Sequence, residues 1–298
     1  MDAQVPLAGH SVRPGGYFHM VSLGLLVFLP ASLFMASLCF MTFFFKELPS
    51  LVWVSISMCL GLSLLLMVVR QKYWFNLGVV CFMAVIFGTA AGLWNYQKNM
   101  DKYWAYQGQR TYSDVPPTKP ALQHLDAGKI VFTADSVIDE KRTNTLVSGR
   151  TFCVAPIVAK GASGKQSLQY WAAGVDCCVK GSKFFCDDAA DPKAHAGLVY
   201  LDDFTLPDYD VGEFRAAAKA MMEAQGLSGA NSNDAIFVRW VKDADAAHRE
   251  YWVVATNFAI IGICVYTVFT IIAGFSIHFN SRRMPPKSKM EARYGGRP

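Results

Sequence analysis

Residues 20–45 read MVSLGLLVFLPASLFMASLCFMTFFF and contain no Asp, Glu, Lys or Arg. A helix needs about 20 apolar residues to cross the hydrocarbon core of a bilayer. Three further stretches share this composition: 51–69, 74–94 and 251–279. A helix of a soluble core would show a polar face at the 3.6-residue period, and these stretches do not. They predict four transmembrane helices.

Charge is concentrated between the third and fourth stretches. Charged residues make up 17% of the chain, compared with about 25% in a typical soluble protein. The pattern predicts an α-helical membrane protein with one water-exposed domain. The expected segments are an N-terminal segment (1–19), three helices (20–94), a water-exposed domain (95–250), a fourth helix (251–279) and a C-terminal tail (280–298).

The distribution of Lys and Arg predicts the orientation, because cytosolic flanks of membrane helices carry an excess of both. The tail holds one acidic residue, Glu291, and six basic residues: Arg282, Arg283, Lys287, Lys289, Arg293 and Arg297. Residues 95–250 hold 18 basic and 20 acidic residues. We therefore expect both termini in the cytosol and residues 95–250 outside it, at the plasma membrane or an endomembrane. The tail is predicted to be disordered and to contact anionic lipids.

Four cysteines fall in the water-exposed domain: Cys153, Cys177, Cys178 and Cys186. On an oxidising side of a membrane, four cysteines predict two disulfides. A bond between the adjacent Cys177 and Cys178 would strain the peptide between them. Two pairings stay open, in which Cys153 bonds either Cys177 or Cys178 and Cys186 bonds the other.

Metal binding is the competing interpretation of this region. Zinc could be held by Cys177, Cys178, Cys186 and His195, but zinc sites usually space two cysteines as C-x₂₋₄-C and adjacent cysteines fit poorly. The acidic residues near positions 187–210 could form a loose calcium site, although a solvated acidic face is the commoner outcome. We expect no metal, no cofactor and no catalytic residue.

The water-exposed domain carries short runs rich in β-branched and aromatic residues. Such runs predict strands at 129–134, 151–158, 168–175, 197–202 and 235–241. One helix is expected at 213–225, closed by Gly226. Prolines at 116, 117 and 120 predict a linker after the third membrane helix. The expected fold is α+β, with an antiparallel sheet and one helix, tied by disulfides.

Motifs of known enzymes and of ion pathways are missing from the sequence. The three histidines of the domain (124, 195 and 248) accompany neither G-x-S-x-G nor H-E-x-x-H. Of the four apolar stretches, only the fourth holds an ionisable histidine, His278 near its end, whereas ion pathways use such groups. Ala84, Gly88 and Gly92 form a small-xxx-small pattern, which indicates close helix packing within the bundle or with a partner.

The layout resembles that of tetraspanins, with four spans, cytosolic ends, a large loop before the last span and the pair Cys177–Cys178. Tetraspanins follow that pair with Gly where this chain has Val179, and their large loop is mostly helical. RTFCVAPIV (150–158) and YWAAGVDCC (170–178) are also similar to segments of uncharacterised multi-span proteins of single-celled eukaryotes. We interpret the tetraspanin resemblance as one of layout, and neither resemblance implies an activity.

The functional prediction is a non-enzymatic four-span protein whose disulfide-tied domain recognises or organises protein partners. One alternative is an accessory subunit of a channel or transporter. Another is an enzyme or a ligand-binding receptor whose site lies in the water-exposed domain. The expected partners are the lipid bilayer and other membrane proteins, and not nucleic acid.

Overall fold

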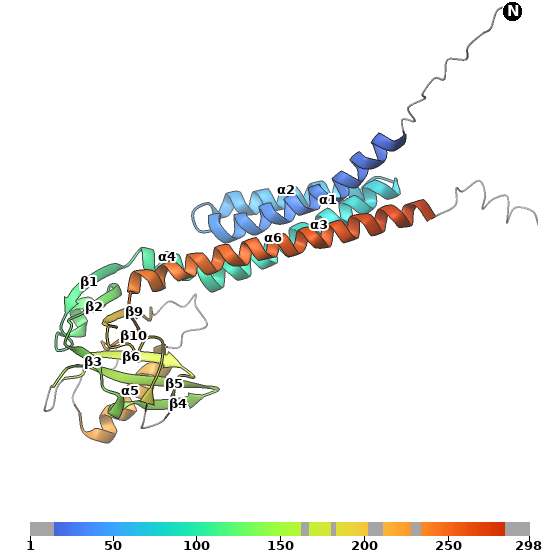
Figure 1. Ribbon diagram of the computed structural model, residues 1–298. Coiled ribbons are helices and arrows are strands. Elements are labelled where there is room, and N and C mark those ends of the chain that lie inside the picture. The colour runs from blue at the N-terminus through green and yellow to red at the C-terminus, as the bar shows by residue number, and fades with distance from the viewer. Residues whose placement is uncertain (1–14, 162–166, 180–182, 202–210, 228–233, 284–298) are drawn as a thin grey trace, which may run out of the picture. The chain divides into compact units, whose positions relative to one another are not determined.

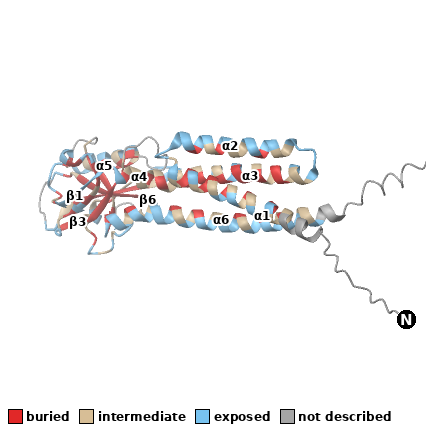
Figure 2. Cartoon of the chain, turned by 90° about the horizontal axis from the view of Figure 1, so that it is seen from above, coloured by how far each residue is buried: buried red, intermediate tan, exposed pale blue. Residues whose placement is uncertain are grey.

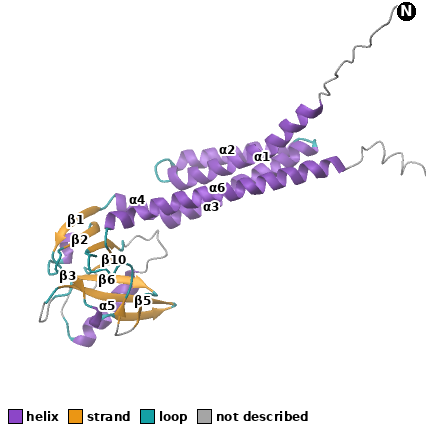
Figure 3. Cartoon of the chain, in the orientation of Figure 1, coloured by secondary structure: helices purple, strands orange, loops and turns teal. Residues whose placement is uncertain are grey.

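The computed structural model describes residues 15–161, 167–179, 183–201, 211–227 and 234–283 (Figure 1). The chain divides into two compact units, residues 1–96 with 256–298 and residues 97–255. Among the described residues, strands occur only in the second unit (Figure 3).

Four helices are long and apolar enough to cross a membrane, which confirms the predicted spans: Ser22–Phe44, Pro49–Val68, Lys72–Gln107 and Ala244–Phe279. They are built from α1 (Gly15–Cys39) with the π-helical η1 (Phe40–Phe44), α2 (Pro49–Val68), α3 (Lys72–Asn95) with η2 (Tyr96–Met100) and α4 (Asp101–Gln107), and α6 (Ala244–Arg283).

Helix α6 extends past residue 279 into the segment predicted to be a disordered tail. Its helical backbone includes Arg282 and Arg283, and the side chains of these two residues are not described. The other basic tail residues lie outside the described residues, as does most of the predicted N-terminal segment.

Helix α3 carries the most buried face of the four helices (Figure 2). Ala84 is fully buried. A β-carbon at Gly88 would lie 2.7 Å from the carbonyl oxygen of Phe34, and one at Gly92 would lie 2.6 Å from Cβ of Met41. The small-residue pattern therefore brings α3 against α1 and η1 of the same chain, where only a missing side chain permits the approach.

Several hydroxyls of the helical unit bond to their own helix, whereas those of Thr89 and Tyr266 are buried and form no hydrogen bond within the described part of the chain. Six hydroxyls donate to the carbonyl four residues earlier: Ser32, Ser37, Ser55, Ser63, Thr267 and Ser276. Between helices, the buried amide of Asn95 donates to the hydroxyl of Thr42 at 3.4 Å. Because lipid offers no partner for a polar group, such bonds are what permit these residues within an apolar helix.

The second unit contains an eight-stranded sheet in the order β1-β2-β9-β10-β6-β5-β3, with β4 also paired to β5. The strands are β1 (Arg110–Val115), β2 (Ala127–Phe132), β3 (Ser136–Ile138), β4 (Asn144–Ser148), β5 (Arg150–Ala159), β6 (Tyr170–Val175), β9 (Ala196–Val199) and β10 (Ile236–Val241). A separate hairpin pairs β7 (Cys178–Val179) with β8 (Lys183–Phe184).

Both faces of the central sheet are buried, which explains its near-continuous apolar runs. In β6, Trp171 belongs to a core on the face covered by α5 (Val211–Gln225), together with Phe214 of that helix. The neighbouring Tyr170 belongs to the core of the opposite face, together with Phe184 of the hairpin. Alternate residues of one strand thus build two cores.

The structure corrects the sequence prediction in two respects. The prediction of an antiparallel sheet is wrong for two pairs of strands. Strands β1 and β2 are parallel, as are β10 and β6, so the sheet is mixed. The stretch directly before the predicted proline linker forms the strand β1, which was not predicted from the sequence. Its sequence, RTYSDV, is mostly polar because it is an edge strand with exposed side chains, so it lacks the apolar run that marks a buried strand.

Candidate functional site: a hairpin held by two disulfides

The four cysteines of the second unit form two neighbouring disulfides. Cys153 bonds Cys178 with a Cα–Cα distance of 5.9 Å, and Cys177 bonds Cys186 with a Cα–Cα distance of 4.9 Å. This is one of the two pairings that the sequence leaves open. The first bond joins the hairpin to β5 of the sheet, and the second closes the base of the hairpin on itself. The adjacent cysteines therefore point to different partners.

The same bonds bear on the zinc interpretation. The sulfur atoms of Cys153, Cys177 and Cys186 lie within 4.8 Å of one another. Zinc binds thiolates, and a sulfur in a disulfide is not a thiolate. In this paired state Cys177, Cys178 and Cys186 cannot act as the zinc ligands of the competing interpretation. His195 is held elsewhere, through a hydrogen bond from Nδ1 to the carbonyl of Ser136 at 3.2 Å.

The outer face of the hairpin exposes two apolar side chains beside Lys183. Cys178 pairs with Phe184 and Val179 with Lys183, and the amide of Phe185 donates to Cys177. Paired residues of an antiparallel hairpin share a face, and the faces alternate along each strand. Phe184 points inward and is 2% exposed, whereas Val179 and Phe185 share the outer face and are 57% and 53% exposed.

The chain entering the hairpin is fixed by Asp176. This residue has a left-handed backbone, with φ 58°. Its carboxylate accepts hydrogen bonds from the amide of Thr151 at 2.9 Å and from Arg150 at 3.1 Å. The backbone bond and the neighbouring guanidinium lower the pKa of Asp176, so the carboxylate stays charged. Asp176 therefore fixes the turn that sends Cys177 and Cys178 to their separate partners.

The chain leaving the hairpin is fixed by Asp187 and Asp188. Asp187, with φ 48°, accepts a hydrogen bond from Arg239 of β10 at 2.7 Å. Burial opposes the charge of Arg239, but the bond to Asp187 raises the pKa of the guanidinium overall. Asp188 accepts from the amide of Lys242 at 2.8 Å and donates its own amide to Trp240. The hairpin base is thus tied to β5 on one side and to β10 on the other.

The acidic residues singled out as a loose calcium site do not gather as free carboxylates where they are described. Asp187 and Asp188 bind the sheet as above, and Asp191 accepts from the amide of Lys193 and pairs with Lys242. The remaining acidic residues of that region, positions 202, 203, 208 and 210, lie outside the described residues.

The other two histidines also have structural partners. Nδ1 of the buried His124 lies 2.8 Å from the hydroxyl of Tyr170. Nε2 of His248 donates to the carbonyl of Tyr103 at 3.0 Å. Each histidine, including His195, therefore has a packing role in the second unit that sequence alone does not reveal.

Comparisons with protein-family models, with curated proteins and with solved structures find no match. The resemblance to tetraspanins stays a prediction from the sequence. The mixed sheet of residues 97–255 differs from the mostly helical loop that this resemblance implies.

Proposed function

We propose that this chain is a multi-pass membrane protein whose disulfide-held hairpin contacts another protein outside the cytosol. The observation that carries the proposal is the exposure of Phe185 and Val179 on a hairpin whose base is fixed. Large apolar side chains exposed on a fixed backbone are typical of contact surfaces.

The rigidity of the hairpin base supports this role energetically. Binding costs free energy when loops and side chains must be ordered, at about 0.5–1.5 kcal/mol for each immobilised side chain. Two disulfides and the Arg239–Asp187 pair hold the backbone on both sides of Phe185. A partner would therefore meet Phe185 on a preorganised backbone, so more of the burial energy of the ring would be available for binding.

The proposed location outside the cytosol rests on two independent features. Disulfides persist in oxidising compartments and are rare in the cytosol. The basic residues at 282–297 and in the link at 70–72 flank the predicted membrane helices on one side, as cytosolic flanks do. Together they favour residues 97–255 on the extracellular or lumenal side.

Purification in a gentle detergent tests the contact. We expect a protein that co-purifies in a fixed ratio with the wild-type chain and is lost with Phe185→Ser. The matched control is Val147→Ser, because Val147 of β4 is another exposed apolar residue of the same unit, at 74%, and it should keep the partner. A chain that purifies alone, or a partner retained by Phe185→Ser, would contradict the proposal.

Labelling of intact cells, or of sealed vesicles where the chain lies in an endomembrane, tests the orientation. A cysteine introduced at Ser113, an exposed residue of β1, should react with a membrane-impermeant maleimide from the side opposite to the C-terminus. Labelling from the cytosolic side, with the native cysteines in the thiol form, would overturn the orientation.

A further inference from the structure

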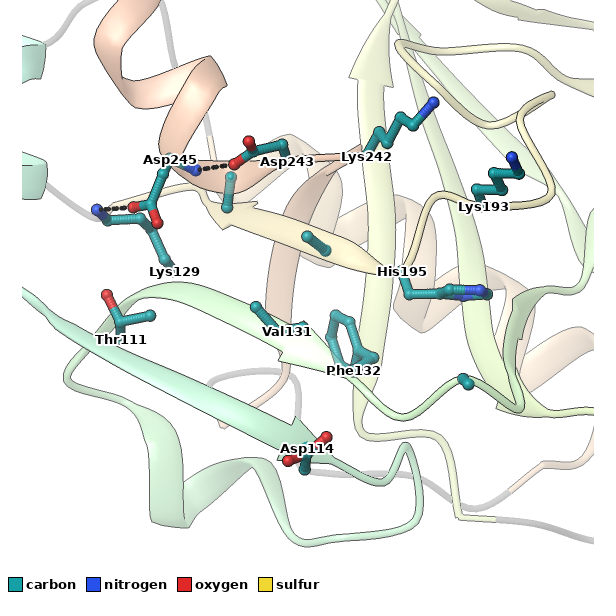
Figure 4. Close-up of a pocket in the computed structure, with 13 residues that line it drawn as sticks. Thr111, Asp114, Lys129, Val131, Phe132, Lys193, His195, Lys242, Asp243 and Asp245 are labelled. Atoms are coloured by element: carbon teal, nitrogen blue, oxygen red, sulfur yellow. Dashed lines mark hydrogen bonds and ion pairs between the residues drawn. The ribbon is translucent and has the colours of Figure 1, made fainter.

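The second unit contains a pocket that neither the membrane helices nor the hairpin explains. Its volume is about 370 Å³, and it is formed by β1, β2, the chain entering β9, the two residues after β10 and the first residues of α6 (Figure 4). Val131 and Phe132 of β2 provide apolar surface, together with Ala134, Ala196 and Ala244. Charged side chains surround this surface. Small-molecule sites commonly combine an apolar lining with a few polar groups.

Much of the charge around the pocket is already neutralised by neighbours. Lys129 pairs with Asp245 at 2.7 Å. The carboxylate of Asp243 accepts the amides of Asp245 and Ala246, at 2.8 and 3.0 Å, and so caps helix α6. These groups are therefore occupied in holding the walls of the pocket.

Lys193 and His195 differ from these groups. Within the described part of the chain, the ammonium of Lys193 forms no direct ion pair or hydrogen bond, although its charge acts on the nearby carboxylate of Asp191. Nδ1 of His195 donates to Ser136, so Nε2 is the ring nitrogen left to meet a ligand. Figure 4 shows both side chains, with Lys242, at one end of the pocket, and Asp114 at another. Lys242 pairs with Asp191 at 3.2 Å in an exposed arrangement, which contributes little.

We propose that this pocket binds a small organic anion, a carboxylate or a phosphate monoester with a compact apolar body. Lys193 supplies a positive charge for the anionic group, and His195 in its imidazolium form, with Nδ1–H on Ser136, donates a second hydrogen bond from Nε2–H. Val131 and Phe132 contact the apolar body. Asp114 repels an anion at its own part of the pocket, which sets the direction in which the ligand lies. This site is separate from the hairpin contact and does not depend on it.

Calorimetry on the full-length chain in phosphatidylcholine nanodiscs tests the proposal. Phenyl phosphate and benzoate supply the anion with an apolar body, and benzylammonium supplies the same body with the opposite charge. We expect at least one of the two anions to bind and benzylammonium not to bind. No binding of either anion at millimolar concentration, or binding of benzylammonium with equal affinity, would overturn the proposal.

Variants assign the binding to this pocket. Lys193→Met should weaken binding of the anion about tenfold, which corresponds to one lost charge-assisted hydrogen bond. Lys219→Met is the matched control, because Lys219 is an exposed lysine of α5 that does not line the pocket, and it should leave the affinity unchanged. An equal loss in the two variants would indicate non-specific attraction and refute the site. Thermal unfolding of each variant verifies that the fold is retained.

Discussion

Gly174 lies directly against Cys177, so that a β-carbon at position 174 would be only 2.6 Å from the sulfur of that cysteine. The sulfur of Cys186 would lie at the same distance. Because the two sulfur atoms are bonded to each other, neither can move away alone. The absence of a side chain at Gly174 is what allows the disulfide to pack onto β6.

Replacing Gly174 by Ala is expected to lower the free energy of unfolding by about 1–3 kcal/mol, the usual cost of overpacking. Thermal unfolding in detergent measures the loss. Gly108→Ala is the control, because its nearest new contact is at 3.8 Å and its φ of −82° suits any residue. A Gly174 variant as stable as the control would contradict the close packing.

Peptide mapping of the oxidised protein should recover Cys153 with Cys178 and Cys177 with Cys186. Fragmentation must separate the adjacent cysteines, since the alternative pairing differs only in which of the two bonds Cys153. Detection of Cys153 bonded to Cys177 would contradict the structure.

The two disulfides should also differ in their contribution to stability. They span 25 and 9 residues of sequence, for which the loop-entropy model gives about 3.5 and about 2.6 kcal/mol. Replacing both cysteines of the longer loop by Ser should therefore cost more than replacing both of the shorter. Chemical unfolding of the two double variants, compared with the wild type, measures the order.

Arg239→Met should lower the free energy of unfolding by about 2 kcal/mol. The side chains of Arg239 and Asp187 are only 23% and 24% exposed, and removing one partner leaves the other charge poorly solvated. Arg150→Met is the comparison, because Arg150 and Asp176 are 60% and 53% exposed. An exposed pair contributes at most about 1 kcal/mol, so equal losses in both variants would show that burial does not strengthen the first pair.

The stability of the second unit should fall in mildly acidic solution because of His124. Burial, with the nearby charge of Lys119, lowers the pKa of His124 below its ordinary value of 6.5. Burial also raises the pKa of Tyr170 to about 12, so its hydroxyl keeps its proton. The unfolded chain binds the proton more readily, so stability is full above about pH 6.5 and decreases as the pH falls toward the folded pKa.

Thermal unfolding of the full-length protein between pH 7.5 and pH 5, performed with wild type and His124→Gln, measures this effect. The variant should be less stable at neutral pH and should depend less on pH within that window. An identical pH dependence in both proteins would show that His124 does not carry it.

Gly92→Leu should destabilise the helical unit by at least about 1 kcal/mol, because the new side chain would clash sterically with η1 and with the end of α1. Gly61→Leu in α2 is the control, since a β-carbon there meets nothing within 4 Å. Unfolding in detergent, followed by helix content, compares them. Equal effects would indicate that α3 does not pack through this glycine.

The sequence was sufficient to predict the four membrane helices, because each helix is a local apolar run. It was also sufficient to predict β5, β6 and β10, because the buried residues of each strand follow one another as an apolar run. It did not predict β1, β3 or β4, which are short or mostly polar strands, nor the parallel pairings. Parallel neighbours are joined by long crossovers that leave no local signal.

The candidate site was predicted only in part. The four cysteines could be grouped, but the choice between Cys177 and Cys178 depends on how Asp176 turns the chain. The bond between Asp187 and Arg239 joins residues 52 positions apart. The pocket joins Lys129, Lys193 and Lys242, which no spacing rule connects. Such contacts follow from the strand order, which was unknown from the sequence.

Strand β10 is the last of the sheet to be made, yet it lies inside it, between β9 and β6. During synthesis on the ribosome, those two strands must wait with open edges until residue 241 has emerged. Only two residues then separate β10 from α6. Synthesis of the strand that completes the sheet is thus followed directly by synthesis of the final helix, and a chain that stalls before β10 would present unpaired strand edges to chaperones and proteases.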